Sequence, residues 1–396
     1  MDAGPEVPEA FQVRSPVCGI LGDHASVLEH TVPAVASHRD RAVGGRVTQG
    51  EERALAAPAT LTEVARLAGV SVATASRVLN GSARRPTEVM RDRVLTAAAR
   101  LDYSPNAAAQ AVARGRTNIV GLVVHGISDP YFATIAAGAI RAGDESGIVM
   151  SIMDTEGSPE REIQYVAALR RQRARAVILA GSRRGNLRLQ RELQEEIELF
   201  LAGGGQVAVI GQQLPGANTV LVENRAAARD LAEKLCTLGY RSYVVLAGPT
   251  NLRTSTDRLA GFRSGLAKHG IPLAANRVVT TDFTRDGGYR AAEAFLASGL
   301  QAECLFAVND VVAVGAMAAL RMHGIHLPDD MAVAGFDDIP TLRDVVPHLT
   351  TVHIPLEALG TQAMALAVAA TVDGAGALVK RFGGSVVVRE STPGLR

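Results

Sequence analysis

The sequence of 396 residues lacks the features that mark secreted, membrane-bound and disulfide-stabilised proteins. Its three cysteines, Cys18, Cys236 and Cys304, lie far apart and form no C-x-x-C pair, which favours idle thiols in a reducing compartment. No apolar run is long enough to cross a bilayer, and acidic residues stand near the N-terminus where a secretory signal would be apolar. We therefore expect a cytoplasmic protein that is not bound to a membrane.

Signatures of common enzymes are also missing. The chain has no G-x-S-x-G, H-E-x-x-H or P-loop motif. A glycine-rich stretch at 203–208 weakly matches a dinucleotide fingerprint, but it precedes an expected strand, whereas the fingerprint follows one. The spacing of His24, His30 and His38 fits no compact ligand set. We expect no catalytic residues, no cofactor and no metal.

Charge is balanced overall and uneven along the chain. The sequence has 41 basic and 40 acidic residues, a net charge of +1 that by itself says nothing about partners. Residues 60–117 contain nine arginines and four acidic residues, a local excess of about five positive charges. Such an excess is typical of a segment that binds nucleic acid.

The basic segment begins with a pattern that predicts two short helices and a tight turn. Thr60 and Glu63 have the spacing of a capping box, Gly69 suits a turn that needs positive φ, and Ser71 can cap the second helix. The second helix presents a small, polar face suited to a DNA major groove. A helical hairpin with a merely solvated outer face is the alternative. Thr87 can cap a third helix whose expected inward residues are Val94, Leu95, Ala98 and Leu101.

Residues 105–117 predict a linker with marginal helical character. The stretch 106–114, NAAAQAVAR, is rich in alanine and begins with a capping asparagine, but a helix this short is barely stable alone in water. From Ile119 onward, nine apolar stretches alternate with helical patterns, starting at IVGLVV and ending at LTTVHI. This rhythm predicts an α/β core of two doubly wound parallel-sheet lobes. Ligands in such folds bind at the carboxyl ends of the strands.

The motif L-x-x-V-A-x-x-A-G-V-S followed by T-x-S-R-V-L-N resembles the DNA-binding headpiece of the LacI/GalR family of bacterial repressors. The resemblance implies a helix-turn-helix over 59–104 and, over 105–117, a hinge helix that inserts side chains into the minor groove; a plain linker is the alternative for this segment. The family usually has leucine at the inserting position, where this chain has Val112. The implied DNA-binding residues are Thr60, Ser71, Val72, Ala73, Thr74, Ser76, Arg77, Asn80, Asn106, Ala109, Val112 and Ala113.

Residues 118–396 resemble the effector domain of the same family, which is similar to periplasmic sugar-binding proteins. The matching motifs are D-P-Y-F at 129–132, D-R-L-A-G-F at 257–262, D-F-T at 282–284, N-D at 309–310 and G-F-D-D at 335–338. The effector-binding residues that the resemblance implies are Tyr131, Phe132, Arg258, Phe283 and Asp310. The chain departs from the family at Glu223–Asn224 and Gly239–Arg241, both expected to lie away from the ligand.

Together these features predict a ligand-responsive transcriptional repressor with an N-terminal extension at 1–58 that we expect to be mostly disordered. We expect a homodimer on a pseudo-palindromic operator of double-stranded DNA. A carbohydrate is the expected effector, with a nucleobase or nucleoside as the alternative. An enzyme and a solute-binding protein without a regulatory role are the rival functions.

Overall fold

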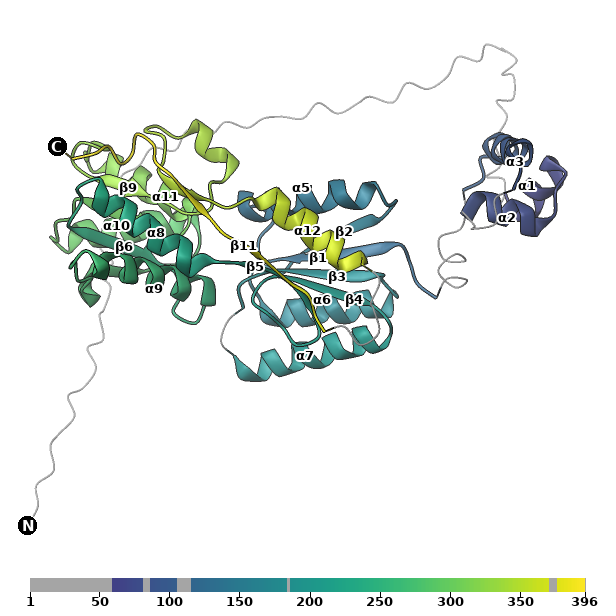
Figure 1. The fold of residues 1–396 in the computed structure, drawn as a ribbon, viewed down its shortest axis with the longest axis horizontal. Helices are drawn as coiled ribbons and strands as arrows, with labels where there is room; N and C mark the ends of the chain where they lie inside the picture. The colour runs from purple at the N-terminus through teal and green to yellow at the C-terminus, as the bar shows by residue number, and fades with distance from the viewer. Residues whose placement is uncertain (1–58, 81–85, 105–114, 184–185, 370–375, 396) are drawn as a thin grey trace, which may run out of the picture. The chain divides into compact units, whose positions relative to one another are not determined.

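The computed structural model describes residues 59–80, 86–104, 115–183, 186–369 and 376–395. The predicted extension at 1–58 lies outside these residues, as do four residues of the predicted hinge: Asn106, Ala109, Val112 and Ala113. The described chain forms a three-helix headpiece and an α/β core (Figure 1). The exact boundaries between domains stay a prediction.

The headpiece consists of three helices, α1 (Leu61–Ala68), α2 (Val72–Asn80) and α3 (Glu88–Arg100). The expected capping box is present: the Thr60 amide donates to Glu63 Oε2 at 2.7 Å, and the Glu63 amide donates to Thr60 Oγ1 at 3.3 Å. Gly69 ends α1 with φ of +65°, a conformation that costs glycine little. Local sequence therefore sets both ends of α1.

One small core holds the three headpiece helices together, formed by Val64, Ala65, Ala68, Ala75, Val94, Ala97 and Ala98. The prediction that Leu95 points inward is wrong, because its side chain is 44% exposed. The inward face of α3 runs through Val94, Ala97, Ala98 and Leu101, the i, i+3, i+4, i+7 spacing of a single helical stripe.

The first lobe of the core is built on a six-stranded parallel sheet in the order β11-β5-β4-β3-β1-β2. Its strands are β1 (Ile119–Val124), β2 (Val149–Asp154), β3 (Ala176–Gly181), β4 (Gln206–Gly211), β5 (Asn218–Val222) and β11 (Val379–Phe382). The central strands β1, β3 and β4 are buried along almost their whole length, as expected for strands covered on both faces.

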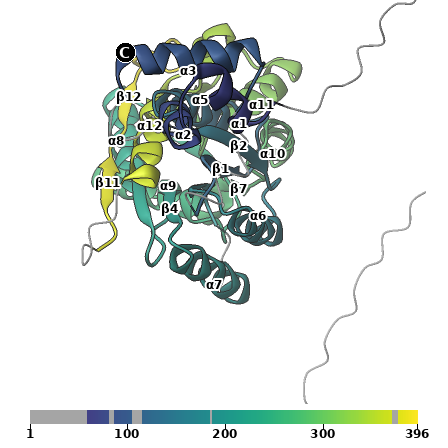
Figure 2. The same ribbon diagram turned by 90° about the vertical axis from the view of Figure 1, so that its right-hand side faces the viewer.

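Helices cover both faces of this sheet (Figures 1 and 2). On one face lie α5 (Pro130–Asp144) and α12 (Leu356–Val368), and on the other lie α6 (Pro159–Arg171) and α7 (Leu187–Ala202). The backbones of α5 and α12 approach closely at two glycines. A side chain at Gly138 would overlap the Glu357 carbonyl, and one at Gly360 would overlap the Ile135 carbonyl. The two glycines thus allow close packing of α5 against α12, although the two helices are far apart in the sequence.

The second lobe has a four-stranded parallel sheet in the order β7-β6-β8-β9. Helices α8 and α9 pack against each other, and so do α10 and α11. The elements are α8 (Asn224–Thr237), β6 (Tyr243–Ala247), α9 (Arg253–Lys268), η1 (Ala275–Arg277), β7 (Val278–Thr280), α10 (Arg285–Ala297), β8 (Cys304–Ala307), α11 (Asp310–Met322), β9 (Ala332–Ala334) and η2 (Pro340–Asp344).

The chain passes between the lobes after β5, after β10 (Thr351–His353) and after β11. The stretch LTTVHI at 349–354 was expected to be a strand of the parallel core. Instead, β10 pairs antiparallel with β12 (Ser385–Val387) in a separate two-stranded sheet. The stretch also runs parallel to β9 and its following loop, since parallel bridges join Ala334 to Thr350 and Asp337 to His353. These short strands are therefore connections between the lobes that lie along the edge of the second sheet.

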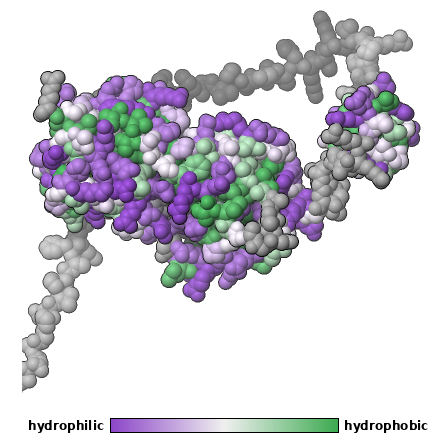
Figure 3. Space-filling model, in the orientation of Figure 1, coloured by the Kyte–Doolittle hydropathy of each residue, from purple (hydrophilic) through white to green (hydrophobic). Residues whose placement is uncertain are grey.

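The predicted fold class, a helix-turn-helix headpiece followed by two parallel-sheet lobes, is confirmed. Cys236 and Cys304 are buried free thiols, while Cys18 lies outside the described residues. No helix in the described ranges is both long and apolar enough to span a membrane. The surface turned to the viewer in Figure 3 is largely hydrophilic and carries separate hydrophobic patches.

Candidate functional site

Helix α2 carries most of the residues that the sequence analysis assigned to the DNA major groove. Val72, Ala73 and Arg77 are exposed, and Thr74 and Ser76 are half-buried, whereas Ala75 is fully buried. Ser71 caps the helix, since its Oγ accepts the Thr74 amide at 3.1 Å. The exposed face thus combines two small apolar side chains with one arginine, beside two half-buried hydroxyls, which fits a major groove. Asn80 ends the helix, and its side chain lies outside the described set.

The second site is a pocket of about 510 Å³ in the α/β core, at the carboxyl ends of strands from both sheets. His125 follows β1, Arg183 follows β3 and Asn224 follows β5 in the first sheet. From the second sheet, Asn309 follows β8 and Asp337 follows β9. This placement at strand ends is where ligands bind in parallel α/β folds. Of the five predicted effector residues, Tyr131, Phe132, Arg258 and Phe283 line this pocket.

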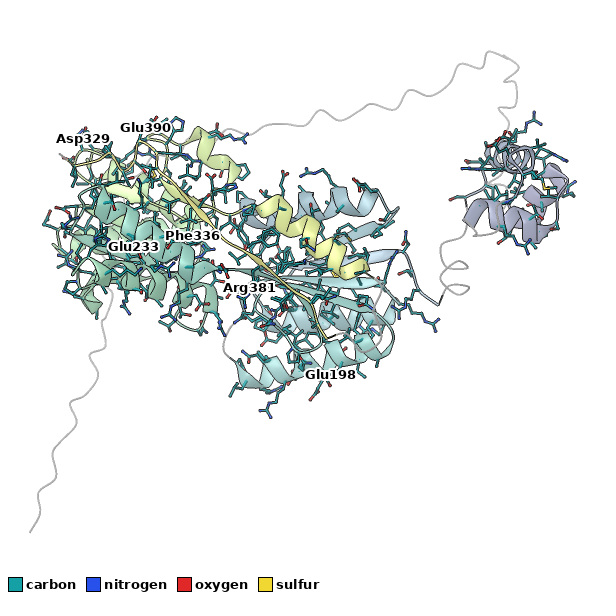
Figure 4. The ribbon with its side chains drawn as sticks, in the orientation of Figure 1. Glu198, Glu233, Asp329, Phe336, Arg381 and Glu390 are labelled. Carbon is teal, nitrogen blue, oxygen red and sulfur yellow. The ribbon has the colours of Figure 1, made fainter. Side chains whose placement is uncertain are left out.

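Arg258 on α9 is the most heavily bonded side chain of the pocket. Its Nη1 and Nη2 donate to Asp337 Oδ2 and Oδ1 at 3.0 and 2.6 Å, and Nη1 also donates to the Val308 carbonyl at 2.7 Å. The guanidinium lies 3.9 Å from the ring centroid of Phe336, which Figure 4 labels. Burial raises the pKa of Asp337, and the neighbouring Arg258 opposes that rise. A planar cation and a carboxylate are therefore fixed together at the pocket wall.

Asn224 corrects one expectation from the sequence. The Glu223–Asn224 departure was expected to lie away from the ligand, but Asn224 lines the pocket and its Oδ1 accepts Arg258 Nε at 2.8 Å. Asn309 is a further wall residue that the sequence analysis did not assign to the effector. Its Oδ1 caps α11 by accepting the Val312 amide at 3.0 Å, which leaves the amide Nδ2 as the group able to donate to a ligand.

Asp310 also differs from the expectation. Its carboxylate is fully buried and is not among the pocket-lining residues. Oδ2 accepts the Ile339 amide at 3.0 Å, and Oδ1 accepts Thr351 Oγ1 at 2.7 Å. Burial raises the pKa of Asp310 well above its ordinary value, and the Asp337 charge adds to the rise. Asp310 supports the loop that carries Asp337, and Asp337 is the carboxylate at the wall.

Aromatic rings form part of the apolar lining of the pocket. Tyr131 and Phe132 at the start of α5 pack edge to face, with ring centroids 5.1 Å apart. Phe283 stands before α10, and a side chain at Gly248 would overlap its ring. Burial raises the pKa of Tyr131, so its hydroxyl stays protonated and can donate. Apolar ring faces beside fixed polar groups suit a ligand that has both.

Asp129 adds a titrating group to the same pocket. It caps α5, because its Oδ1 accepts the Tyr131 amide at 2.9 Å. Burial raises the pKa of Asp129 to about 6; Asp337 adds to the rise, and the hydrogen bond from Tyr131 and the charge of Arg258 oppose it. With this pKa, Asp129 changes charge near pH 6.

Sequence comparisons place the chain in a known protein class. Residues 60–106 match the model for "Bacterial regulatory proteins, lacI family", and residues 232–392 match a "Periplasmic binding protein-like domain". The HTH-type transcriptional regulator GalR of Escherichia coli K12 is 32% identical over 313 residues, covering 78% of this chain and 89% of that protein.

Structure comparisons agree. The lac repressor dimer bound to operator and the anti-inducer ONPF has a TM-score of 0.70 and 25% identity, covering 85% of this chain and all of that chain. The transcriptional regulator CelR in complex with cellobiose has a TM-score of 0.62 and 27% identity, covering 84% of this chain and 99% of that chain.

The headpiece and the two-lobed core together define a DNA-binding transcriptional regulator that responds to a ligand. The presence of the headpiece favours this class over a solute-binding protein with the same core fold. The chain belongs to the LacI/GalR family of bacterial regulators.

Proposed function

We propose that this protein is a sugar-responsive repressor and not an enzyme. A homodimer places two headpieces on the half-sites of a pseudo-palindromic operator, because twofold symmetry in the protein matches twofold symmetry in the DNA. The lac repressor, which resembles this chain, was solved as a dimer bound to its operator. A protein that acts on chromosomal DNA works in the cytoplasm.

In this proposal α2 lies in the major groove. Arg77 supplies the charged contact, and the exposed Val72 and Ala73 meet thymine methyl groups. Thr60 and Ser71, near the starts of α1 and α2, stand where helix N-termini favour phosphate groups. The hinge side chains of Asn106, Ala109, Val112 and Ala113 enter the minor groove.

The pocket holds the effector, and the observation that carries this part is the buried pair of Arg258 and Asp337 beside aromatic faces. Arg258 holds the Asp337 carboxylate in place, and each carboxylate oxygen can accept a further hydrogen bond from a ligand hydroxyl. The ring faces cover the apolar side of a sugar. CelR, a relative of similar fold, was solved with cellobiose. These facts support a carbohydrate over a nucleobase.

A thermal-shift screen against sugars and purines tests the effector class. A ligand that binds only the native protein raises its melting temperature, by an amount set by concentration and affinity. We expect at least one neutral sugar to raise the melting temperature of the wild type and to lose this effect in Asp337→Asn. Stabilisation by purines alone would contradict the carbohydrate assignment.

A further inference from the structure

A second buried ion pair lines the pocket, on the wall formed by the first lobe. Glu162 lies in the first turn of α6, and Arg183 lies two residues beyond the end of β3. Arg183 Nη2 donates to Glu162 Oε1 at 3.0 Å, and the two side chains are only 6% and 5% exposed. Both residues line the pocket that also holds Arg258 and Asp337.

Arg183 is bonded far less completely than Arg258. Its Nε and Nη1 are buried and have no acceptor among the described residues, whereas every guanidinium nitrogen of Arg258 has one. Buried donors normally have partners, because stripping them of water without replacement costs free energy. Two unmet donors in a ligand pocket indicate that the ligand supplies the acceptors.

Two hydrogen bonds hold the chain at Ser182 and Arg183. The Arg183 amide donates to Gln212 Oε1 at 3.0 Å. Its neighbour Ser182 accepts the Thr254 amide of α9 at 3.0 Å, a hydrogen bond from the second lobe to the first. The incomplete bonding of the side chain is therefore not explained by a loosely held backbone.

We propose that Arg183 is a specificity-determining residue that donates from Nε and Nη1 to two uncharged hydroxyl oxygens of the effector. This inference rests on the proposed function. In a guanidinium, Nε–H and Nη1 lie on opposite sides of the Nε–Cζ bond, so a single carboxylate cannot accept from both. Two separate oxygens are needed, as a polyhydroxylated ring provides.

The charges of the pocket favour a neutral ligand over an acidic one. Six carboxylates line the pocket, against two arginines. Asp282 and Glu156 pair with Arg290 and Arg161 outside the pocket lining, and Glu162 and Asp337 pair with Arg183 and Arg258. Among the described residues, the pocket carboxylates left without an ion-pair partner are Asp129 and Asp154. A further anion would enter an environment that is already negative. The effector class is therefore a neutral polyol whose hydroxyls reach both lobes.

The double variant Glu162→Gln/Arg183→Met tests this role without leaving either charge unpaired in the interior. The matched control is Glu192→Gln/Arg188→Met, an ion pair on α7 with side chains 40% and 80% exposed. Calorimetric titration measures the Kd of glucose, galactose, ribose and cellobiose, and of the acids glucuronate, galacturonate and glucose 6-phosphate. Differential scanning calorimetry measures the melting temperature without ligand.

We expect the wild type to bind at least one neutral sugar. The double variant should bind that sugar at least tenfold more weakly, while the control is unchanged. Its melting temperature without ligand should be no lower than that of the wild type, because it loses two unmet buried donors and keeps no buried charge of this pair.

Unchanged sugar affinity in the double variant, with a lowered melting temperature, would make the pair purely structural and overturn the inference. Tighter binding of an acid than of its neutral parent, lost in the double variant, would overturn the neutral class. A wild type that binds no sugar would refute the proposed function itself, and the inference would fall with it; this outcome is visible before any variant is made.

Discussion

Asp337 and Arg258 meet through two hydrogen bonds of 2.6 and 3.0 Å, with side chains 6% and 3% exposed. Asp337 has φ of +112°, in a region of backbone conformation that is strained for any residue other than glycine. Asp310 holds the following residues in place through the Ile339 amide. A buttressed, strained loop thus fixes the carboxylate that faces both Arg258 and the ligand.

Asp337→Asn should weaken both effector binding and stability. Asparagine keeps an acceptor but removes the charge that Arg258 is paired with, and breaking a buried pair costs about 3–5 kcal/mol. We expect the free energy of unfolding to fall by about 3 kcal/mol and the effector Kd to rise at least tenfold, as measured by urea unfolding and calorimetric titration.

The control is Asp230→Asn, which breaks a pair with Arg229 whose side chains are 39% and 51% exposed. Its cost should stay below about 1 kcal/mol. Equal losses in the two variants would contradict a special role for the buried pair.

Asp129→Asn should change how stability depends on pH. Burial raises the pKa of native Asp129 from 3.8 to about 6, so between these values the native state holds a proton that the unfolded chain releases. The contribution of Asp129 to the free energy of unfolding therefore falls as pH rises from about 4 to about 6. Asparagine lacks this term, so the variant should gain stability relative to wild type across that interval.

Urea unfolding of both proteins at half-unit pH steps measures the difference, and subtraction removes the titration of the other carboxylates. A difference that stays flat from pH 4 to 6 would show that Asp129 titrates at its ordinary pKa of 3.8.

Arg77→Ala should reduce operator affinity and leave effector binding intact. Removing one groove contact to a base costs about 1–3 kcal/mol, or roughly five- to 150-fold in Kd. Fluorescence anisotropy with operator DNA at fixed salt measures the loss. The control is Arg188→Ala on α7 of the core, which removes the same charge from a side chain that is 80% exposed. An equal loss of operator affinity in this control would mean that the loss reflects net charge and not a contact in the groove.

Val112→Leu should raise operator affinity. A longer apolar side chain inserts more deeply between base steps and stabilises a sharper kink. The expected gain is about two- to tenfold, because one buried methylene contributes about 0.8 kcal/mol. Affinity and DNA bending, measured by energy transfer between end labels, should increase together. Unchanged bending would argue against insertion at this position.

The headpiece could be predicted from the sequence almost in full, because its elements are set locally. The capping box at Thr60, the turn at Gly69 and the cap at Ser71 depend on residues within a few positions of each other. The prediction that Leu95 points inward was wrong because α3 has a weak apolar stripe, whose members include Ala97 and Ala98. An error of one position in the inward face of such a helix is hard to detect from the sequence.

The alternation of strands and helices in the core could be predicted from the sequence, but several of its short strands could not. Strands β5, β11 and β12 escaped notice because they are short or carry polar residues. The pocket shows a similar limit. N-D and G-F-D-D both matched the family pattern, but only tertiary structure shows that Asp310 is turned into the interior while Asn309 and Asp337 line the wall. Arg183 and Glu162 carried no sequence signal, since their pairing joins a strand end to a separate helix.

The most direct test of the central claim is operator binding measured with and without effector. Purified protein is titrated onto a duplex that spans the region upstream of its own gene, at fixed salt, with each sugar that raises its melting temperature. Sequence-specific binding should change at least fivefold when the sugar is added, as expected for a coupling free energy of about 1–3 kcal/mol between two sites. The central claim would be contradicted if the protein bound this duplex no more tightly than unrelated DNA at low salt, with or without any sugar.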